Sequence, residues 1–590
     1  MSNANCHCKW LMFSATLGML AGLSIQARGQ AVVDDWSTRH LIFSNPGTEG
    51  EALAKGTYSQ WWKIVNDSRY IMQQRKRNHV WDGPPADPWR RSKPTVSRDW
   101  AFSLGTGGGI AQNMFPAKYT LDVTATPSCT NDFVVYGLTG TTANLVALNE
   151  LYSNTGGTGF CSGKTGPSVY WAYTGTPNAG TITTSPVLSE NGQDVIYVES
   201  TSSGSYLHVL VWNPNTGTLA SPTTPTSVAN VGACTSGESC LVSLKFGSTT
   251  DTNSSPFYDD TNDIVYVGND AGVLYKITPV LKGTPVIAAN VTVQTAGVGP
   301  HTSVLTGPVY DPNSGYVFVG DSNGVLSAVK ASTFSSVTNT LAVGEASSGC
   351  SGSYNNALKD PPMVDSTHGW VYEYTTDNSS YDVEIAQAST TTATLFSTTN
   401  TVTFGSADSG CNSSNNMYTH APDFDNTYYT GTVTSGHMWA CARVSGSTSP
   451  ELYYVATSGT GGGLAASGTS GIDTQINAAS HGECSPITEF YNSTTSTDYV
   501  FFGEGHSGSY ASFYGYTISG ATGTQITPLT GYPDADFNGG TSGVVVDNNS
   551  SDTEASSIYF MLLNPATSAA TCGAIGDYCA IKVTQSALGQ

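Results

Sequence analysis

Five polar side chains in the second half of the chain are the strongest candidates for chemistry. They are Lys359, Asp360, His420, His481 and Glu483. Only 11% of all residues are charged, so this is the most polar grouping that the sequence offers. A histidine beside a carboxylate can transfer a proton, and a neighbouring lysine can hold an anion. The pattern indicates an anion or sugar site, or general acid–base chemistry by a His–carboxylate pair.

A second candidate is a calcium loop near the C-terminus. Asp534, Asp536 and Asn538 precede a glycine and reproduce the D-x-D-x-N-G opening of such a loop. Position twelve is Val545 instead of Glu, which excludes an EF-hand, and a looser site that uses Asp547 is the alternative. Asp and Asn beside Gly also form turns without a metal, and this interpretation is favoured. Any Ca²⁺ bound here would be structural.

Familiar catalytic and nucleic-acid-binding features are absent from the sequence. There is no H-E-x-x-H motif, and the nearest match to G-x-S-x-G, at 505–509, lacks the final glycine. The net charge of −22 provides no basic surface to release counterions from a nucleic acid. We therefore expect no nucleic-acid partner.

The candidate residues lie at equivalent points of a repeat that begins near residue 119. Each copy has a Ser/Thr-Pro start, an Asp/Asn/Gly turn and two Val/Ile/Tyr-rich strands, as in "SSPFYDDTNDIVYVGNDAGVLYKI" from Ser254 and "TGPVYDPNSGYVFVGDSNGVLSAV" from Thr306. The anchor positions are Pro127, Pro186, Pro256, Pro308, Pro362, Pro422, Pro486 and, in place of proline, Gly543. Spacings of 52 to 70 residues, with about four short strands per unit, predict a β-propeller. Eight copies predict eight blades; seven is the alternative if a terminal copy is partial.

In a propeller, the residues just before the anchors are expected at the mouth of the central channel. Read around the ring, they are Ser185, Ser255, Thr306, Asp360, His420, Ser485 and Ser542. The five candidates would then come from three successive blades. They would form a ligand site or simply line a wet channel, and the second interpretation is favoured because propeller channels are polar anyway.

The best copies resemble the pyrroloquinoline-quinone-type (PQQ-like) propeller repeat, whose blades commonly read "vYvGt-dG-lyAlda-tG". The matching stretches are "IVYVGNDAGVLYKI" at 264–277, "YVFVGDSNGVLSAV" at 316–329 and "VLVWNPNTGTL" at 209–219. The chain also resembles large exported bacterial propellers of unassigned function. In enzymes of the PQQ type, the resemblance implies a quinone over the channel with Ca²⁺ held by carboxylates and an amide.

The chain departs from the pattern of the PQQ enzymes in two respects. It has no adjacent cysteines, and no tryptophan follows Thr216-Gly217 or Thr522-Gly523. We therefore do not expect PQQ as a cofactor. A PQQ/Ca²⁺-dependent oxidoreductase of alcohols or sugars is kept as the alternative function.

Residues 30–118 differ in kind from the repeats and are expected to form a Trp-rich, partly helical extension and linker ahead of a propeller at 119–590. Residues 31–100 hold six of the eleven tryptophans and eleven bases against eight acids, whereas 101–590 holds nine bases against 36 acids. Thr48 and Glu51 form a capping-box signature. The favoured interpretation packs this basic segment on the acidic propeller; a docking module for a glycan or partner is the alternative.

Two further elements are expected in this extension. Asp67 or Ser68 can cap a second helix that ends in the basic residues 75–77. A strand of the extension is also expected to complete the last blade and so close the ring.

Residues 1–29 have the features of a secretory signal peptide. Lys9 precedes an apolar run at 10–25, and small residues follow at 27–29. No later segment approaches the ~20 apolar residues that a membrane-spanning helix needs. We expect a secreted protein, extracellular or periplasmic, without a transmembrane span.

Ten cysteines follow the predicted cleavage site, and an even number in an exported chain favours disulfides over metal ligation. The close pairs Cys234/Cys240 and Cys572/Cys579 predict local loop staples. The near-duplicate loops "SGCSGSYNNALKDPP" at 348–362 and "SGCNSSNNMYTHAP" at 409–422 make Cys350–Cys411 a candidate bridge between blades.

The sequence therefore predicts an all-β, eight-bladed (alternatively seven-bladed) propeller with a short helical N-terminal extension, exported and monomeric. The expected function is a non-catalytic binding or scaffold module for a surface glycan or a protein partner, and no catalytic residue is assigned. A carbohydrate-cleaving enzyme is the second alternative; it needs paired carboxylates across the channel, for which only Asp360 and Glu483 are candidates.

Overall fold

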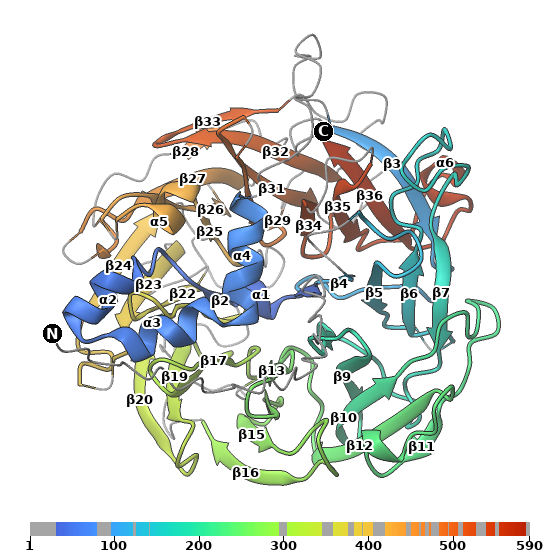
Figure 1. Cartoon of the computed structure of the whole chain (residues 1–590), viewed down its shortest axis with the longest axis horizontal. Coiled ribbons are helices and arrows are strands. Elements are labelled where there is room, and N and C mark those ends of the chain that lie inside the picture. Colours follow the sequence, from blue (N-terminus) through green and yellow to red (C-terminus); the bar gives the residue numbers. More distant parts are fainter. Residues whose placement is uncertain are drawn as a thin grey trace, which may run out of the picture.

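Eight β-sheets form a closed ring around a central axis, as expected for a propeller with eight blades and not seven (Figure 1). The structure is a computed structural model that describes residues 31–78, 96–121, 126–140, 142–293, 304–344, 358–375, 383–391, 393–404, 419–432, 434–443, 450–459, 462–465, 471–473, 483–493, 495–505, 511–526, 539–548 and 554–585. The predicted signal peptide lies outside these ranges. Among the described helices, none has the length and apolar character needed to cross a membrane.

Blades 1 to 4 follow one another along the chain, each with its first strand nearest the axis. Blade 1 contains β4 (Ala117–Thr120), β5 (Phe133–Gly137), β6 (Leu145–Asn149) and β7 (Ser168–Tyr173). Blade 2 contains β8 (Val187–Leu188), β9 (Asp194–Thr201), β10 (Gly204–Val211), β12 (Cys240–Gly247) and, outermost, β11 (Thr226–Val228), which leads into the short 3₁₀ helix η1 (Val231–Ala233). Blade 3 contains β13 (Phe257–Asp259), β14 (Ile264–Val267), β15 (Val273–Ile277) and β16 (Ile287–Thr292). Blade 4 contains β17 (Val309–Asp311), β18 (Tyr316–Gly320), β19 (Val325–Lys330) and β20 (Val337–Ala342).

Blades 5 to 8 complete the circle. Blade 5 contains β21 (Met363–Asp365), β22 (Trp370–Thr375), β23 (Val383–Ser389) and β24 (Thr399–Phe404). Blade 6 contains β25 (Asp423–Phe424), β26 (His437–Arg443), β27 (Pro450–Ala456) and β28 (Gly471–Asp473), with α5 (Asn426–Thr430) in its first turn. Blade 7 contains β29 (Glu483–Cys484), β30 (Thr488–Asn492), β31 (Thr497–Gly505), β32 (Ala511–Ser519) and β33 (Thr522–Gln525). Blade 8 contains β34 (Val545–Asn548), β35 (Ser556–Met561), β36 (Cys579–Gln585) and β3 (Val96–Ser103), with α6 (Ala569–Cys572) before β36.

The repeated sequence produces the same local structure in successive blades. The hairpin between β14 and β15 turns at Asn269, whose side-chain oxygen accepts hydrogen bonds from two backbone N–H groups, both at 3.0 Å. In the next blade Asp321 occupies the same place and accepts from the backbone at 2.8 and 3.1 Å. Gly272 and Gly324 follow with φ of 74° and 78°, a conformation that favours glycine. The turn chemistry in the sequence therefore sets the register of each hairpin.

The strands of each blade are buried between neighbouring blades. Val265, Tyr266 and Val267 of β14 are at most 1% exposed. The ring of Tyr266 packs against Tyr310 and Phe334 of blade 4, with centroids 5.4 and 5.7 Å apart. These contacts confirm that the short apolar runs are strands covered on both faces.

In its described residues, the N-terminal extension supplies four helices and three strands. They are β1 (Val32–Asp34), α1 (Ser37–His40), β2 (Leu41–Ile42), α2 (Glu49–Lys55), α3 (Tyr58–Val65), α4 (Ser68–Asn78) and β3. The capping box of Thr48 and Glu51 is present at the start of α2, which ends at Gly56 in the left-handed region, φ 70°. Asp67 accepts from the backbone N–H of Arg69 at 2.9 Å, as expected for a residue that caps α4.

Strand β3 closes the ring. It pairs antiparallel with β36, from Val96 opposite Gln585 to Ser103 opposite Cys579. Because the strand from the beginning of the chain completes the last blade, opening the ring requires this ladder to separate. The sequence-based expectation of such a closure is confirmed.

Four disulfides connect the described residues. Cys234–Cys240 and Cys572–Cys579 are the two predicted local staples. Cys129–Cys161 lies within blade 1, and Cys441–Cys484 joins blade 6 to blade 7. Cys350 and Cys411 lie outside the described residues, so a bridge between them stays a prediction.

Candidate functional site

The N-terminal extension crosses the centre of the ring. Strand β1 pairs with β4, the inner strand of blade 1, and β2 pairs with β21, the inner strand of blade 5 on the opposite side. Helix α1 joins the two and lies over the middle of the ring, and the other blue helices of the extension lie over one half of this face (Figure 1). The extension therefore spans the central channel instead of lying beside it.

Aromatic side chains fill the channel beneath α1. Trp36 is 1% exposed, and its indole Nε1 donates to the carbonyl of Pro256, the anchor residue of blade 3, at 3.2 Å. His40, also 1% exposed, packs against Trp36 at 5.5 Å and against Phe115 at 6.4 Å between ring centroids. We call these three residues, Trp36, His40 and Phe115, the aromatic plug.

The anchor positions of the blades are shaped to the aromatic plug. Phe115 follows β3, and its backbone N–H donates to the hydroxyl of Ser185 at 2.9 Å. A Cβ on Gly543 would lie 2.4 Å from the Phe115 ring, and one on Gly307 would lie 3.2 Å from the Trp36 ring. Glycine replaces the anchor proline in blade 8 because Phe115 occupies the space of a side chain there.

The structure brings together two of the five predicted site residues. His420 Nδ1 lies 2.9 Å from one carboxylate oxygen of Asp360, and the other oxygen accepts from the backbone N–H of Ala421 at 2.8 Å. Burial raises the pKa of Asp360, but the adjacent His420 and the Ala421 N–H outweigh it and hold this pKa below its usual value. Asp360 and His420 are 1% and 6% exposed. The pair ties blade 5 to blade 6, and its burial is poorly suited to contact with a ligand.

The other predicted site residues are only partly placed. The carbonyl of Lys359 accepts from the side-chain amides of Asn253 at 2.7 Å and Asn113 at 3.2 Å, which ties its backbone to two neighbouring segments. Glu483 begins β29, and its side chain and all of His481 lie outside the described residues. The calcium-loop residues Asp534, Asp536 and Asn538 also lie outside them. A ligand role for the five residues and a Ca²⁺ role for these three remain predictions.

The hydroxyl residues before the anchors have a structural role. Thr306 Oγ1 accepts from Gly320 N at 3.0 Å. Ser485 Oγ accepts from Gly503 N at 2.9 Å. Ser542 Oγ makes the equivalent bond to the backbone of blade 8. These bonds close the inner hairpins of blades 4, 7 and 8, so the Ser or Thr before the anchor has a structural role in these three blades.

Cations of the extension are bound by the acidic propeller. Arg77 forms a bidentate pair with Glu489 of β30, at 2.6 and 2.5 Å, and its guanidinium lies 3.7 Å from the Tyr429 ring centroid. Arg39 pairs with Asp423 at 3.3 Å. Arg69 donates to the carbonyl of Tyr258 at 2.7 Å. These contacts support the interpretation that the basic segment packs against the propeller.

The tryptophans of the extension are not all buried. Trp36 and Trp100 are 1% and 2% exposed, whereas Trp62 on α3 is 53% exposed. Trp81 and Trp89 lie outside the described residues. The exposed indole of Trp62 is compatible with a docking role for the extension.

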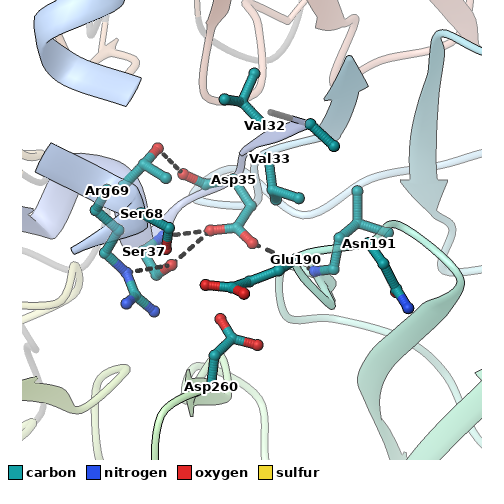
Figure 2. A pocket seen from close by; sticks show the side chains of 12 residues that line it. Val32, Val33, Asp35, Ser37, Ser68, Arg69, Glu190, Asn191 and Asp260 are labelled. Atoms are coloured by element: carbon teal, nitrogen blue, oxygen red, sulfur yellow. Dashed lines mark hydrogen bonds between the residues drawn. The ribbon is translucent and has the colours of Figure 1, made fainter. Parts of the chain in front are cut away.

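A cavity of about 290 Å³ lies in the seam between the extension and blades 2 and 3. Asp35, Glu190 and Asp260 reach it from three separate elements, and Arg69 lies at its edge. Figure 2 shows the carboxylates of Glu190 and Asp260 directed toward one another below Asp35. Burial raises the pKa of Asp260 to about 8, although Arg69 acts in the opposite direction.

The seam continues on both sides of Arg69. A neighbouring cavity of about 430 Å³ shares Arg69, Glu190 and Asp260 and is also lined by Trp62 and Tyr310. A further cavity of about 280 Å³ lies between α3 and the turns of blades 4 and 5. The concave surfaces of this face therefore follow the edge of the N-terminal extension, and the 290 Å³ cavity reaches α1 beside Trp36.

Sequence reasoning missed a Ser–His–Asp cluster at this seam. Ser44 Oγ and Asp365 Oδ2 lie 2.5 and 3.1 Å from His368 Nδ1, and Ser44 Oγ is 2.5 Å from Asp365. A nucleophilic triad needs the serine and the carboxylate on different ring nitrogens, but here both approach Nδ1. Ser44 is also 0% exposed. The cluster fixes the extension to blade 5, and no local motif could have revealed it because Ser44 is 324 residues from His368.

The described residues at the axis are mainly aromatic. Trp36, His40 and Phe115 occupy the space in which a planar cofactor would stack. Within the described ranges, no three or more His, Cys, Asp or Glu side chains are grouped in a way that could hold a metal ion. The absence of PQQ therefore stays a prediction from the sequence.

Comparisons with known proteins give similarity of fold only. No family model matches the sequence, and no curated protein matches it. Among solved structures, BamB from Moraxella catarrhalis is similar over 82% of this chain and 99% of that one, with 11% identity and a TM-score of 0.40. The WD40 β-propeller domain of Doa1 is similar over 69% and 93%, with 11% identity and a TM-score of 0.34. A chain of the Mitotic Checkpoint Complex is similar over 72% and 93%, with 8% identity and a TM-score of 0.33.

Proposed function

We propose that this protein is an exported, non-catalytic binding module whose helix-covered face takes a surface glycan or a protein partner. The observation that carries the proposal is the aromatic plug, since Trp36, His40 and Phe115 close the channel that a propeller enzyme would use for its cofactor or substrate. The Asp360 carboxylate is buried and is bonded to His420 and to the backbone N–H of Ala421. In this proposal neither the filled channel nor the Asp360 carboxylate takes part in turnover.

The four disulfides and the even number of cysteines support export to an oxidising compartment. We place the mature protein outside the cytoplasm, extracellular or periplasmic, as a monomer. A PQQ-like origin of the blades is part of this proposal and is supported by the repeats at 264–277 and 316–329.

The proposal is tested by titrating the purified mature protein with PQQ, with and without Ca²⁺, followed by a dye-reduction assay on alcohols and sugars. We expect no saturable binding and no dye reduction. Stoichiometric, Ca²⁺-dependent binding with turnover would refute the proposal and establish an oxidoreductase. A parallel glycan array identifies the class of glycan if the partner is a carbohydrate.

One observation favours carbohydrate cleavage as a second candidate. Glu190 and Asp260 direct their carboxylates toward one another across the 290 Å³ cavity (Figure 2). The pKa of Asp260 is raised to about 8 by burial, so this group is protonated at neutral pH, as a general acid must be. Release of nitrophenol from a panel of aryl glycosides, abolished in Asp260→Asn, would establish this activity; no release would retire it.

A further inference from the structure

The two cavities on either side of Arg69 adjoin and form one groove along the edge of the extension. The cavity of about 290 Å³ and the cavity of about 430 Å³ share four lining residues, Ser68, Arg69, Glu190 and Asp260. The walls come from the extension and from the β8–β9, β13–β14 and β17–β18 turns. We call this surface of the extension and blades 2 to 4 the seam groove.

The seam groove carries an excess of negative charge. Its lining contains two cations, Lys63 and Arg69, and five carboxylates, Asp35, Asp67, Glu190, Asp259 and Asp260. The Arg69 guanidinium donates to the carbonyl of Tyr258 at 2.7 Å and to the Ser37 hydroxyl at 3.3 Å. The Lys63 ammonium donates to the Pro312 carbonyl at 3.5 Å. Among the described residues, the side chains of both cations therefore bond to neutral oxygen atoms and to no carboxylate.

Two carboxylates of the seam groove have no partner of opposite charge. Figure 2 shows Glu190 and Asp260 directed toward one another below Asp35. Within the described part of the chain, neither carboxylate forms an ion pair or a hydrogen bond. Burial and the neighbouring carboxylates raise the pKa of Asp260 to about 8, although Arg69 acts in the opposite direction. A cation placed between the two groups would stabilise the ionised form of both.

Aromatic rings line the same groove. Trp62 is 53% exposed and Tyr310 is half-buried, and both face the larger cavity. Burial, followed by the charge of Asp259, raises the pKa of Tyr310 to about 12, so a carboxylate lies near this ring. An aromatic face in an acidic setting is suited to a cation, which is attracted by the negative face of the ring.

The arginines of the extension show how this face of the propeller binds cations. The Arg77 guanidinium lies 3.7 Å from the ring centroid of Tyr429 and pairs with the Glu489 carboxylate. The Arg69 guanidinium lies 4.6 Å from the ring centroid of Phe257. The seam groove presents the same combination of aromatic rings and carboxylates. Its carboxylates, however, have no arginine or lysine of the described chain bonded to them.

The lining fits an organic cation better than a metal ion or a neutral ligand. Within the described ranges, no three His, Cys, Asp or Glu side chains are grouped in a way that could hold a metal ion. A neutral sugar would leave the carboxylates of Glu190 and Asp260 without a countercharge. A guanidinium or ammonium group on a long side chain can reach these carboxylates and also cover a ring.

We propose that the seam groove docks a basic segment of a partner protein. One arginine or lysine side chain of this segment lies between Glu190 and Asp260, and a second lies over Trp62. This inference rests on the proposed binding function and names the partner as a protein with an exposed basic segment. Complementary charge at such a surface speeds association and disfavours acidic partners.

The test uses the purified protein and a fluorescein-labelled peptide in which arginines alternate with Gly-Ser, measured by fluorescence anisotropy. A matched peptide carries citrulline in place of each arginine, which keeps the shape of the side chain and removes its charge. We expect saturable binding of the arginine peptide and none of the citrulline peptide. Binding should weaken as NaCl is raised from about 50 to about 300 mM, because salt screens charges at a surface.

Two variants locate the binding. Glu190→Gln combined with Asp260→Asn should weaken binding of the arginine peptide about tenfold, because the peptide loses its charge-assisted bonds. Trp62→Ala should weaken it about threefold, as expected for a cation–π contact at an exposed site. Neither variant should melt measurably lower than the unaltered protein, because the two carboxylates have no partner and the indole is exposed.

Glu49→Gln combined with Glu238→Gln is the matched control. Both side chains are exposed and neither lines the seam groove. This variant removes the same charge and should change the affinity for the arginine peptide less than about twofold. Equal weakening by the two double variants would show attraction to the acidic surface as a whole and overturn the inference. No binding of the arginine peptide would also overturn it.

A photo-cross-linking group beside the central arginine of the peptide provides a measurement that does not depend on a variant. Cross-links to residues 62–69 or 260–262 are expected, and cross-links only elsewhere would overturn the inference. Glycan binding that is lost in Trp62→Ala, without any peptide binding, would assign the groove to a carbohydrate. That result would overturn this inference and leave the proposed function intact, whereas the quinone titration decides the proposed function independently.

Discussion

Removing the largest side chain of the aromatic plug should destabilise the whole propeller. Trp36 is 1% exposed, packs against His40 and Phe257, and donates to the Pro256 carbonyl. A tryptophan buries roughly 150–250 Å², which at about 25 cal/mol per Å² is about 4–6 kcal/mol. Measured Trp→Ala losses are about 3–5 kcal/mol. Leaving the Pro256 carbonyl unpaired adds about 1 kcal/mol, so we expect Trp36→Ala to cost about 5 kcal/mol.

This loss can be converted to a shift in melting temperature. Without the predicted signal peptide, residues 30–590 make a chain of 561 residues. At about 2.1 cal/mol/K per residue its unfolding entropy is about 1.2 kcal/mol/K, so 5 kcal/mol lowers the melting temperature by about 4 °C. Calorimetry or circular dichroism of the two proteins measures this shift directly.

Trp62→Ala is the matched control, because it removes the same side chain from the same extension at a position that is 53% exposed. A surface change of this kind is worth about 0.5 kcal/mol or less, which is a shift below about 0.5 °C. If Trp36→Ala shifted the melting temperature no more than Trp62→Ala, Trp36 would not hold the plug in place. The argument for a closed channel would then fail.

Two further predictions concern charges buried by the extension. Arg77→Ala should lower the free energy of unfolding by about 3–5 kcal/mol, because it leaves Glu489 buried without its partner. Lys164→Ala is the control: it breaks a pair whose lysine is 50% exposed and should lower the free energy of unfolding by under about 1 kcal/mol. Equal losses for the two variants in urea denaturation would contradict this prediction. The pKa of His40 is lowered from 6.5 to about 4, chiefly by burial, so the unfolded chain binds more protons below pH 6.5 and stability falls as the pH drops. Between pH 7 and pH 5 the imidazole of His40 should lower the free energy of unfolding by about 2 kcal/mol. The curve of stability against pH for His40→Gln should lack this loss. Parallel curves for the variant and the unaltered protein would show that His40 does not cause it.

Much of the fold could be predicted because its signals are local. A blade is built from neighbouring hairpins, so the turn residues around Asn269 and Asp321 and the apolar runs beside them specify it within about 25 residues. The capping box of Thr48 and the staple Cys234–Cys240 are equally local. Eight repetitions of such signals predicted eight blades, with seven as the alternative, and the eight sheets of the structure confirm the first.

The candidate sites were harder to predict because they depend on contacts between distant parts of the chain. Asp360 and His420 were correctly expected to be neighbours, since both precede an anchor on successive blades. Nothing in the sequence indicated that Trp36 bonds to Pro256, 220 residues away. The one available hint was Gly543, a glycine where seven other copies have proline, which reflects the close approach of Phe115.

The aromatic plug changes where a ligand can bind on this propeller. In a ring with an open channel, the polar residues before the anchors would meet at the axis and form the natural site. Here the extension uses Trp36 and His40 to fill that space. Its helices create new concave surfaces where they meet the turns of blades 2 to 5. In blades 3 to 5 an aspartate at the start of each turn accepts from the backbone two or three residues later, so these turns share one backbone geometry and differ in their exposed side chains. Binding specificity should therefore depend on the side chains of the seam and not on the residues at the axis.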